Sequence, residues 1–219
     1  YITNAPQADV FLVMARTDPS STGSNGISAF LVDATLDGIR VGDPPKMLGN
    51  EGSHACYVWF ENCEVPADSI VGGQEGRGLK AALRGINHAR LHVAATCVGQ
   101  AIRLITEMTE YASKREQFGK RIGEFGQIAA MLADSRAEMA AGRALCLDCA
   151  KQFDAGDQIP FIDIASAKLF CSEMVSRVAD RAVQVMGGLG YMEDLSDVPR
   201  LFRDVRLFRI FEGASQVQQ

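Results

Sequence analysis

A single carboxylate near the end of the chain, Glu212, stands where the surrounding pattern places apolar side chains. If residues 200–213 form a helix, Glu212 continues an apolar stripe at helical spacing. That stripe consists of Leu201, Val205 and Phe208. A carboxylate on a buried stripe could act as a general base, because desolvation disfavours the anion and makes it a stronger proton acceptor. The competing interpretation is an acid at a frayed helix end, pointing to water or paired with a nearby arginine.

Gly213 follows Glu212 directly and predicts the end of this helix. The carboxylate of Glu212 would then lie at the negative end of the helix macrodipole, which also disfavours the anion. Burial and the helix macrodipole would therefore both disfavour the anion, which favours a role as a general base.

A second charge lies on a predicted core face far upstream. Arg90 falls on a stripe formed by Leu83, Ile86, Val93 and Cys97. A guanidinium stays protonated even when buried, so Arg90 needs an anionic partner or ligand, or must extend to the surface. An internal salt bridge and a ligand-binding role both stay open.

Composition sets broad limits on what the chain does. It has 219 residues, 47% of them hydrophobic, with a formal net charge of −5. This balance predicts a globular protein and argues against nucleic acid or an anionic membrane as the main partner. No apolar run reaches membrane-spanning length, so we expect no integral membrane segment. The six cysteines are scattered and predict reduced thiols, and the CxxC spacing at 146–149 is interpreted as packing.

The first third of the chain predicts antiparallel sheet. Apolar runs at 10–15, 27–32 and 55–60 are separated by turn-forming sequence and predict strands. A glycine-rich segment at 72–78 fits neither a P-loop nor a dinucleotide fingerprint and is interpreted as a linker. We therefore predict a boundary there, with domains at residues 1–75 and 76–219.

The second part predicts helices. Periodicity and stop signals indicate helices at 79–114, 124–153, 160–186 and 200–213. Four helices with short connections predict an up-and-down bundle. Sheet followed by helices makes the fold class α+β with more than one domain.

Several short motifs, taken together and in order, resemble the C-terminal portion of the acyl-CoA dehydrogenase family over essentially all 219 residues. They are Tyr1-Ile2-Thr3-Asn4, Gly26-Ile27-Ser28-Ala29-Phe30-Leu31-Val32, Val65-Pro66, Arg115-Glu116-Gln117-Phe118-Gly119-Lys120, Gln184-Val185-Met186-Gly187-Gly188-Leu189-Gly190-Tyr191, Arg203-Asp204 and Phe211-Glu212-Gly213-Ala214-Ser215-Gln216. The chain starts without methionine, and the resemblance implies further helical and strand sequence before Tyr1.

The resemblance implies the second half of an antiparallel β-barrel domain followed by a C-terminal four-helix bundle. It implies an FAD enzyme that oxidises an acyl-CoA thioester to the trans-2-enoyl-CoA and passes electrons to an electron-transfer flavoprotein. A homotetramer, or a homodimer, is expected, in the cytoplasm of a bacterium or the mitochondrial matrix of a eukaryote. An oxidase of the same fold and a non-catalytic oligomerisation module stay open as alternatives.

The same resemblance implies site residues. Glu212 matches the base that removes the α-proton, and Arg90 and Gly213 match positions near the substrate. A minority of the family carries its base at the position of Ala89, where alanine cannot serve. Nine residues match positions that contact FAD: Thr3, Arg115, Gln117, Phe118, Gln184, Gly187, Gly188, Ser215 and Gln216.

Overall fold

The computed structural model describes residues 1–156 and 161–219. Its contacts divide the chain into two compact units, residues 1–86 and 87–219, and each is described by itself. This division falls within the first long helix, so the domain boundary between residues 75 and 76 stays a prediction.

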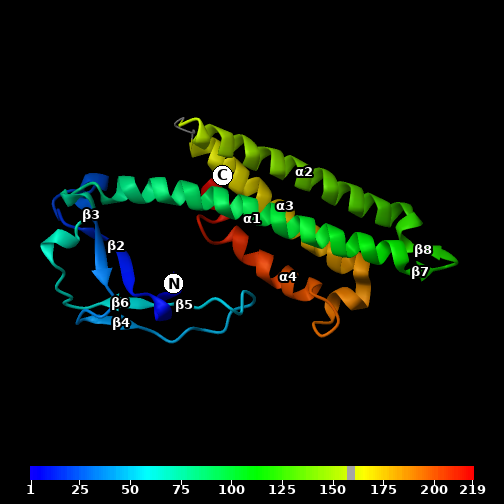
Figure 1. Cartoon of the computed structure of the whole chain (residues 1–219), viewed down its shortest axis with the longest axis horizontal. Helices are drawn as coiled ribbons and strands as arrows, with labels where there is room; N and C mark the ends of the chain where they lie inside the picture. The colour runs from blue at the N-terminus through cyan, green and yellow to red at the C-terminus, as the bar shows by residue number, and fades with distance from the viewer. Residues whose placement is uncertain (157–160) are drawn as a thin grey trace. The chain divides into compact units, whose positions relative to one another are not determined.

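A β-hairpin forms the centre of the first unit. Strand β2 (Val10–Arg16) pairs antiparallel with β3 (Ile27–Asp33), as the two apolar runs predict (Figure 1). Alternate residues face opposite sides of the hairpin, so that Phe11 and Val32 are buried in a small core while their neighbours Leu12 and Leu31 are exposed.

The strand predicted over residues 55–60 is wrong in its extent, because the chain changes partners at Tyr57. Strand β5 (Ala55–Cys56) pairs with β1 (Ile2–Thr3), whereas β6 (Val58–Phe60) pairs with β4 (Ile39–Val41). The mixed strand-and-helix class is confirmed. All the named strands pair two by two, and the partial barrel stays a prediction.

The glycine-rich linker packs tightly against β3. The Gly76 N–H donates a hydrogen bond to Ser28 Oγ at 2.9 Å. A Cβ on Gly78 would lie 2.3 Å from the backbone carbonyl carbon of Ser28, so only glycine fits there. This backbone approach explains Gly76 and Gly78 without a phosphate ligand.

Three long helices dominate the second unit. Helix α1 (Gly78–Lys114) enters it at Asn87, α2 (Gly126–Asp154) runs back, and α3 (Phe161–Met186) reverses again (Figure 1). The helix start predicted at Pro160 lies outside the described residues. Strands β7 (Glu116–Gln117) and β8 (Lys120–Arg121) form a small hairpin between α1 and α2.

The second unit has its own apolar core. Its members come from all three long helices and from the short helix α4 (Val198–Val205), so the chain folds back on itself in the predicted up-and-down order (Figure 1). Helices α2 and α3 approach closely at Gly142, where a Cβ would lie 3.1 Å from Cys171 Sγ.

The single helix predicted over residues 200–213 is wrong beyond Arg209. Helix α4 ends at Val205, a 3₁₀ turn spans Arg206–Arg209, and a four-residue helix α5 (Ser215–Gln218) follows. Glu212 and Gly213 have φ values of 52° and 92°, in the left-handed region that a right-handed helix excludes. Glu212 therefore lies in an irregular turn, and the macrodipole argument does not apply to it.

In the described part of the chain, no helix combines the length and apolar character needed to cross a membrane. All six cysteines are free thiols, and both cysteines of the CxxC segment are buried in packing.

Candidate active site

The turn formed by residues 210–214, called the Glu212 turn below, is unusual in its backbone. A non-glycine residue in the left-handed region costs on the order of 1 kcal/mol or more and persists only where surrounding contacts hold it. Glu212 is such a residue, and Gly213 continues the same backbone conformation. Side chains from three separate helices donate hydrogen bonds to the carbonyl oxygens of these two residues.

Arg90 of α1 is the first of these donors. Its side chain is buried, with the residue 7% exposed, and Nε donates to the Glu212 carbonyl oxygen at 3.1 Å. Nη1 donates to Asn87 Oδ1 at 3.2 Å, and the guanidinium lies over the Phe161 ring at 4.8 Å from its centroid. Within the described residues Arg90 forms no salt bridge, so the internal ion pair left open by the sequence is absent there.

Lys168 of α3 is the second donor, and it is fully buried at 0% exposure. Its Nζ donates to the Gly213 carbonyl oxygen at 2.6 Å. Burial lowers the pKa of Lys168, and the positive charge of Arg90 lowers it further, whereas Cys97, Glu212 and Glu173 act in the opposite direction. The cationic side chains of Arg90 and Lys168 therefore both donate hydrogen bonds to the backbone of the Glu212 turn.

Gln218 of α5 is the third donor, with Nε2 at 3.2 Å from the Glu212 carbonyl oxygen. The same residue is buried, and its Oε1 has no hydrogen-bond partner among the described residues. A Cβ on Gly213 would lie 2.1 Å from Gln218 Nε2, so a larger residue would displace the Gln218 side chain, and the φ of 92° itself favours glycine.

Ser215 is anchored away from the turn. Its Oγ donates to Glu173 Oε1 at 2.7 Å, and Arg209 Nε donates to the same oxygen at 2.8 Å. Burial raises the pKa of the Glu173 carboxyl, but these two hydrogen bonds outweigh burial and hold its pKa below the usual value. Ser215 thus ties α5 to α3, whereas its neighbour Gln216 is exposed.

This arrangement fixes the backbone of Glu212 and leaves its reactive groups available. The side chain is half-buried, and within the described residues its carboxylate forms no salt bridge and its N–H makes no backbone hydrogen bond. A free carboxylate beside a free N–H can accept a proton while donating a hydrogen bond to an adjacent oxygen.

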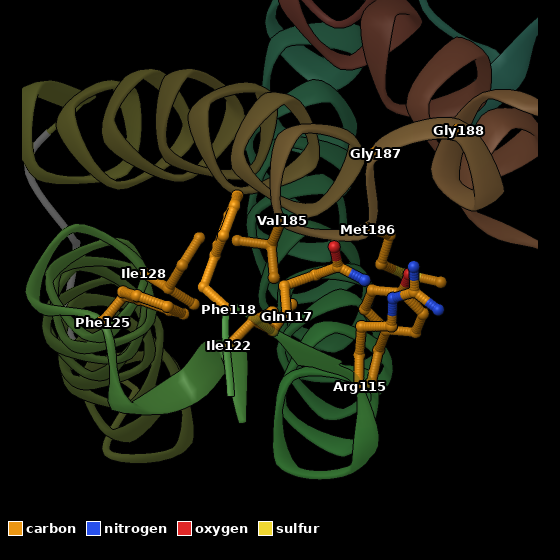
Figure 2. Close-up of a pocket in the computed structure, with 11 residues that line it drawn as sticks. Arg115, Gln117, Phe118, Ile122, Phe125, Ile128, Val185, Met186, Gly187 and Gly188 are labelled. Atoms are coloured by element: carbon orange, nitrogen blue, oxygen red, sulfur yellow. The ribbon is translucent and has the colours of Figure 1, made fainter. Parts of the chain in front are cut away.

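A second site lies at the β7–β8 hairpin, at the opposite end of the helices from the chain terminus (Figure 1). Here a pocket of about 360 Å³, the hairpin pocket, brings together five of the predicted cofactor residues (Figure 2). They are Arg115, Gln117, Phe118, Gly187 and Gly188. The motifs at residues 115–120 and 184–191, about 70 residues apart in the sequence, therefore both contribute residues to this pocket.

The chemistry of the hairpin pocket suits an anionic, partly aromatic ligand. Arg115 forms no salt bridge within the described residues, so its guanidinium is free to pair with phosphate. Gly187 has φ of 57° and open space around its missing Cβ, which exposes its backbone to a ligand. Phe118 is 93% exposed, and its ring meets Phe125 edge to face at 6.3 Å.

Four of the nine predicted cofactor residues do not line the hairpin pocket: Ser215 and Gln216, described above, and Gln184 and Thr3. Gln184 is exposed on the last turn of α3, one residue before Val185, which does line it. Thr3 is exposed in β1 and pairs with Ala55 in the first unit. Their roles toward a cofactor stay predictions.

Lys168 and Gln218 were missed from the sequence. A signal for Lys168 was present, because it occupies a helical stripe on α3 at the same spacing that pointed to Arg90. That stripe consists of Ile164, Lys168, Cys171, Val175, Val178, Ala182 and Val185. Gln218 carries no such signal, because its contact depends on the Glu212 turn, which lies between the 3₁₀ turn Arg206–Arg209 and α5.

Comparisons with known proteins agree over both units. Residues 1–63 match the family model described as acyl-CoA dehydrogenase, middle domain, and residues 76–219 match acyl-CoA dehydrogenase, C-terminal domain. A Dictyostelium discoideum protein named "Probable short/branched chain specific acyl-CoA dehydrogenase" is 37% identical over 219 residues, which are 100% of this chain and 52% of that protein.

Two further relatives are similar over the same length. The "Caffeyl-CoA reductase-Etf complex subunit CarC" of Acetobacterium woodii is 36% identical over 100% of this chain and 57% of its own. The solved structure "PigA with FAD and proline" has a TM-score of 0.94 at 30% identity, covering 99% of this chain and 55% of that one. The chain spans about half the length of the curated relatives it matches.

Proposed function

The chain belongs to the acyl-CoA dehydrogenase family, and from this premise we propose that its protein oxidises an acyl-CoA thioester to the trans-2-enoyl-CoA with FAD as cofactor. The observation that carries the proposal is the Glu212 turn: a carboxylate without a salt bridge in the described residues, on a backbone held by buried side chains from three helices. Such a group can act as a base at a fixed position.

In the proposed reaction the Glu212 carboxylate removes the α-proton of the thioester. The free N–H of Glu212 donates a hydrogen bond to the thioester carbonyl oxygen, where negative charge develops as the proton leaves. Arg90 and Lys168 hold the two carbonyl oxygens of the turn, so that carboxylate and N–H keep their relative positions. FAD, when bound, supplies the acceptor for the hydride that leaves the β-carbon.

The hairpin pocket supports the assignment of FAD. Its unpaired Arg115 guanidinium and the open backbone at Gly187 and Gly188 fit a dinucleotide's phosphates and adenosine. Because this pocket and the Glu212 turn lie at opposite ends of the helices, we propose that the pocket serves the cofactor of a neighbouring subunit (Figure 1). That requires a homo-oligomer, for which a tetramer is the family expectation.

We further propose an electron-transfer flavoprotein as electron acceptor. The relative from Acetobacterium woodii is named as a subunit of an Etf complex, and it is similar over the whole of this chain.

The test is substrate-induced flavin bleaching in the full-length, FAD-loaded protein. Glu212→Gln keeps the side-chain volume but removes the base, so bleaching by an acyl-CoA should slow by at least about a thousandfold while FAD stays bound. Glu193→Gln serves as control, because Glu193 is an exposed acid that pairs with Arg203 away from the Glu212 turn. The rate of bleaching is followed by stopped-flow absorbance at the oxidised-flavin band.

Two results would contradict the proposal. If the full-length protein showed no oxidised-flavin band, FAD would not be its cofactor. Rapid bleaching in Glu212→Gln would remove Glu212 as the base.

A further inference from the structure

We propose that Lys168 is a positioning residue of the reaction, which holds the Glu212 turn in its productive conformation through the Gly213 carbonyl oxygen. The inference rests on the proposed function and extends it to a side chain that does not reach the substrate. The juxtaposition that carries it is a fully buried ammonium at 2.6 Å from the backbone of the residue next to the proposed base.

Folding alone does not explain this lysine. An ammonium in an apolar core is strongly penalised unless it is paired, and an apolar side chain of similar volume is generally at least as stable. Lys168 occupies a stripe whose other members are Ile164, Cys171, Val175 and further apolar residues of α3. Within the described residues it forms no salt bridge, and its hydrogen bond goes to a backbone carbonyl of the turn.

The hydrogen bond from Lys168 acts on the backbone directly after Glu212. Gly213 and Glu212 both lie in the left-handed region, so the peptide between them must be fixed on both sides. Arg90 and Gln218 hold the Glu212 carbonyl oxygen, and Lys168 alone holds that of Gly213 among the described residues. Arg209 and Ser215 tie the two flanks of the turn to Glu173 of α3, but without Lys168 the Gly213 carbonyl oxygen itself loses its hydrogen bond to that helix.

Charge adds to the geometry. The groups that interact electrostatically with Lys168 are Arg90 and Cys97 of α1, Glu173 of α3 and Glu212 of the turn. Lys168 and Glu212 attract each other, so the ammonium favours conformations that keep the carboxylate on this side of the turn. An apolar replacement removes both the hydrogen bond and this attraction.

The experiment compares Lys168→Met and Lys168→Gln with wild type in the full-length, FAD-loaded enzyme. Methionine keeps an unbranched chain without a donor, whereas glutamine restores an N–H donor without charge. We expect kcat per bound flavin to fall about tenfold or more in Lys168→Met with KM unchanged, because the loss affects the placement of the base. Lys168→Gln should recover part of the lost kcat.

Val178→Ala is the matched control. Val178 is a fully buried residue of the same α3 stripe, and its truncation removes core packing while leaving the three hydrogen-bond donors to the turn in place. It should lower the unfolding temperature while leaving kcat per flavin unchanged. If Lys168→Met behaved like Val178→Ala, with lower stability and unchanged kcat, the positioning role would be overturned.

Hydrogen exchange of the backbone amides at 211–214 provides a readout independent of turnover. Lys168→Met should raise exchange there relative to wild type and to Val178→Ala, and unchanged exchange would overturn the proposal. A failure of the proposed function would show differently, as a wild-type enzyme that does not bleach with any acyl-CoA, while the exchange result still decides whether Lys168 holds the turn.

Discussion

At the scale of single residues, Arg90 and Glu212 could be identified from the sequence, whereas Lys168, the other charged residue at the Glu212 turn, was missed. Arg90 and Glu212 were found because each falls on an apolar stripe, and both meet at one turn in the structure. Lys168 carries the same signal, because it falls on an apolar stripe of α3 at helical spacing. The left-handed φ of Glu212 had no signal, because it depends on contacts between helices that are distant in sequence.

Glu173 makes stability depend on pH. Burial raises its pKa, but hydrogen bonds from Ser215 and Arg209 lower it more, so the folded pKa lies below the unfolded one. A lowered carboxyl pKa contributes stability above the unfolded value of about 4.3, and this is lost as pH falls through the folded pKa. Wild type should therefore exceed Glu173→Gln in stability at neutral pH, with the difference shrinking in acid below about pH 4.

Urea unfolding of both proteins between neutral and acidic pH measures this difference. Glu110→Gln is a suitable control, because Glu110 is an exposed carboxylate that pairs with Lys114 Nζ at 3.9 Å. A difference between wild type and Glu173→Gln that stayed constant across the whole pH range would contradict the prediction.

At the scale of elements, the long helices could be predicted and the last one could not. Helix α1 matches its predicted range of 79–114 closely, because a long periodic stripe outweighs local irregularity. The same periodicity over residues 200–213 was misleading, because apolar residues at helical spacing also suit a short helix followed by a 3₁₀ turn. The hydrogen bonds from Arg90, Lys168 and Gln218 to the Glu212 turn come from other helices, so local preference could not predict that turn.

Gly142 controls the approach of α2 to α3. A Cβ there would lie 3.1 Å from Cys171 Sγ and 3.3 Å from Met174 Cε, so a larger side chain must push the helices apart. We expect Gly142→Leu to lower the free energy of unfolding by about 1–3 kcal/mol, despite the higher helix propensity of leucine. Chemical denaturation measures the change.

Gly99→Leu is the matched control for this overpacking. Gly99 lies in the interior of α1 with nothing within 4 Å of a Cβ, so the substitution should leave stability unchanged or raise it by up to about 1 kcal/mol. Equal destabilisation by both substitutions would show that packing at Gly142 is not the cause.

At the scale of the whole molecule, the hairpin pocket links cofactor binding to assembly. If its ligand is the FAD of a neighbouring subunit, dilution of the full-length protein should release FAD as subunits dissociate. Arg115→Ala should weaken FAD retention about tenfold or more, because it removes a free guanidinium from the pocket. Analytical ultracentrifugation with detection at the flavin band follows both events in one sample.

Lys114→Ala is the control for charge at this end of α1. Lys114 precedes Arg115, is highly exposed, and pairs with Glu110 without lining the pocket. Its FAD retention should equal that of wild type. If Arg115→Ala subunits dissociated and still kept their FAD, the pocket would not bind the FAD of a neighbouring subunit.

The backbone of Glu212 also bears on how this sequence is shaped by selection. Glycine or asparagine would occupy a φ of 52° with less strain than glutamate, so selection for folding alone would favour them at this position. The chain instead keeps a large acidic residue there and surrounds it with a buried lysine and a buried arginine, each unfavourable in a core. Three residues that are poor choices for stability thus coincide at one turn, which is the pattern expected where selection for function opposes selection for stability.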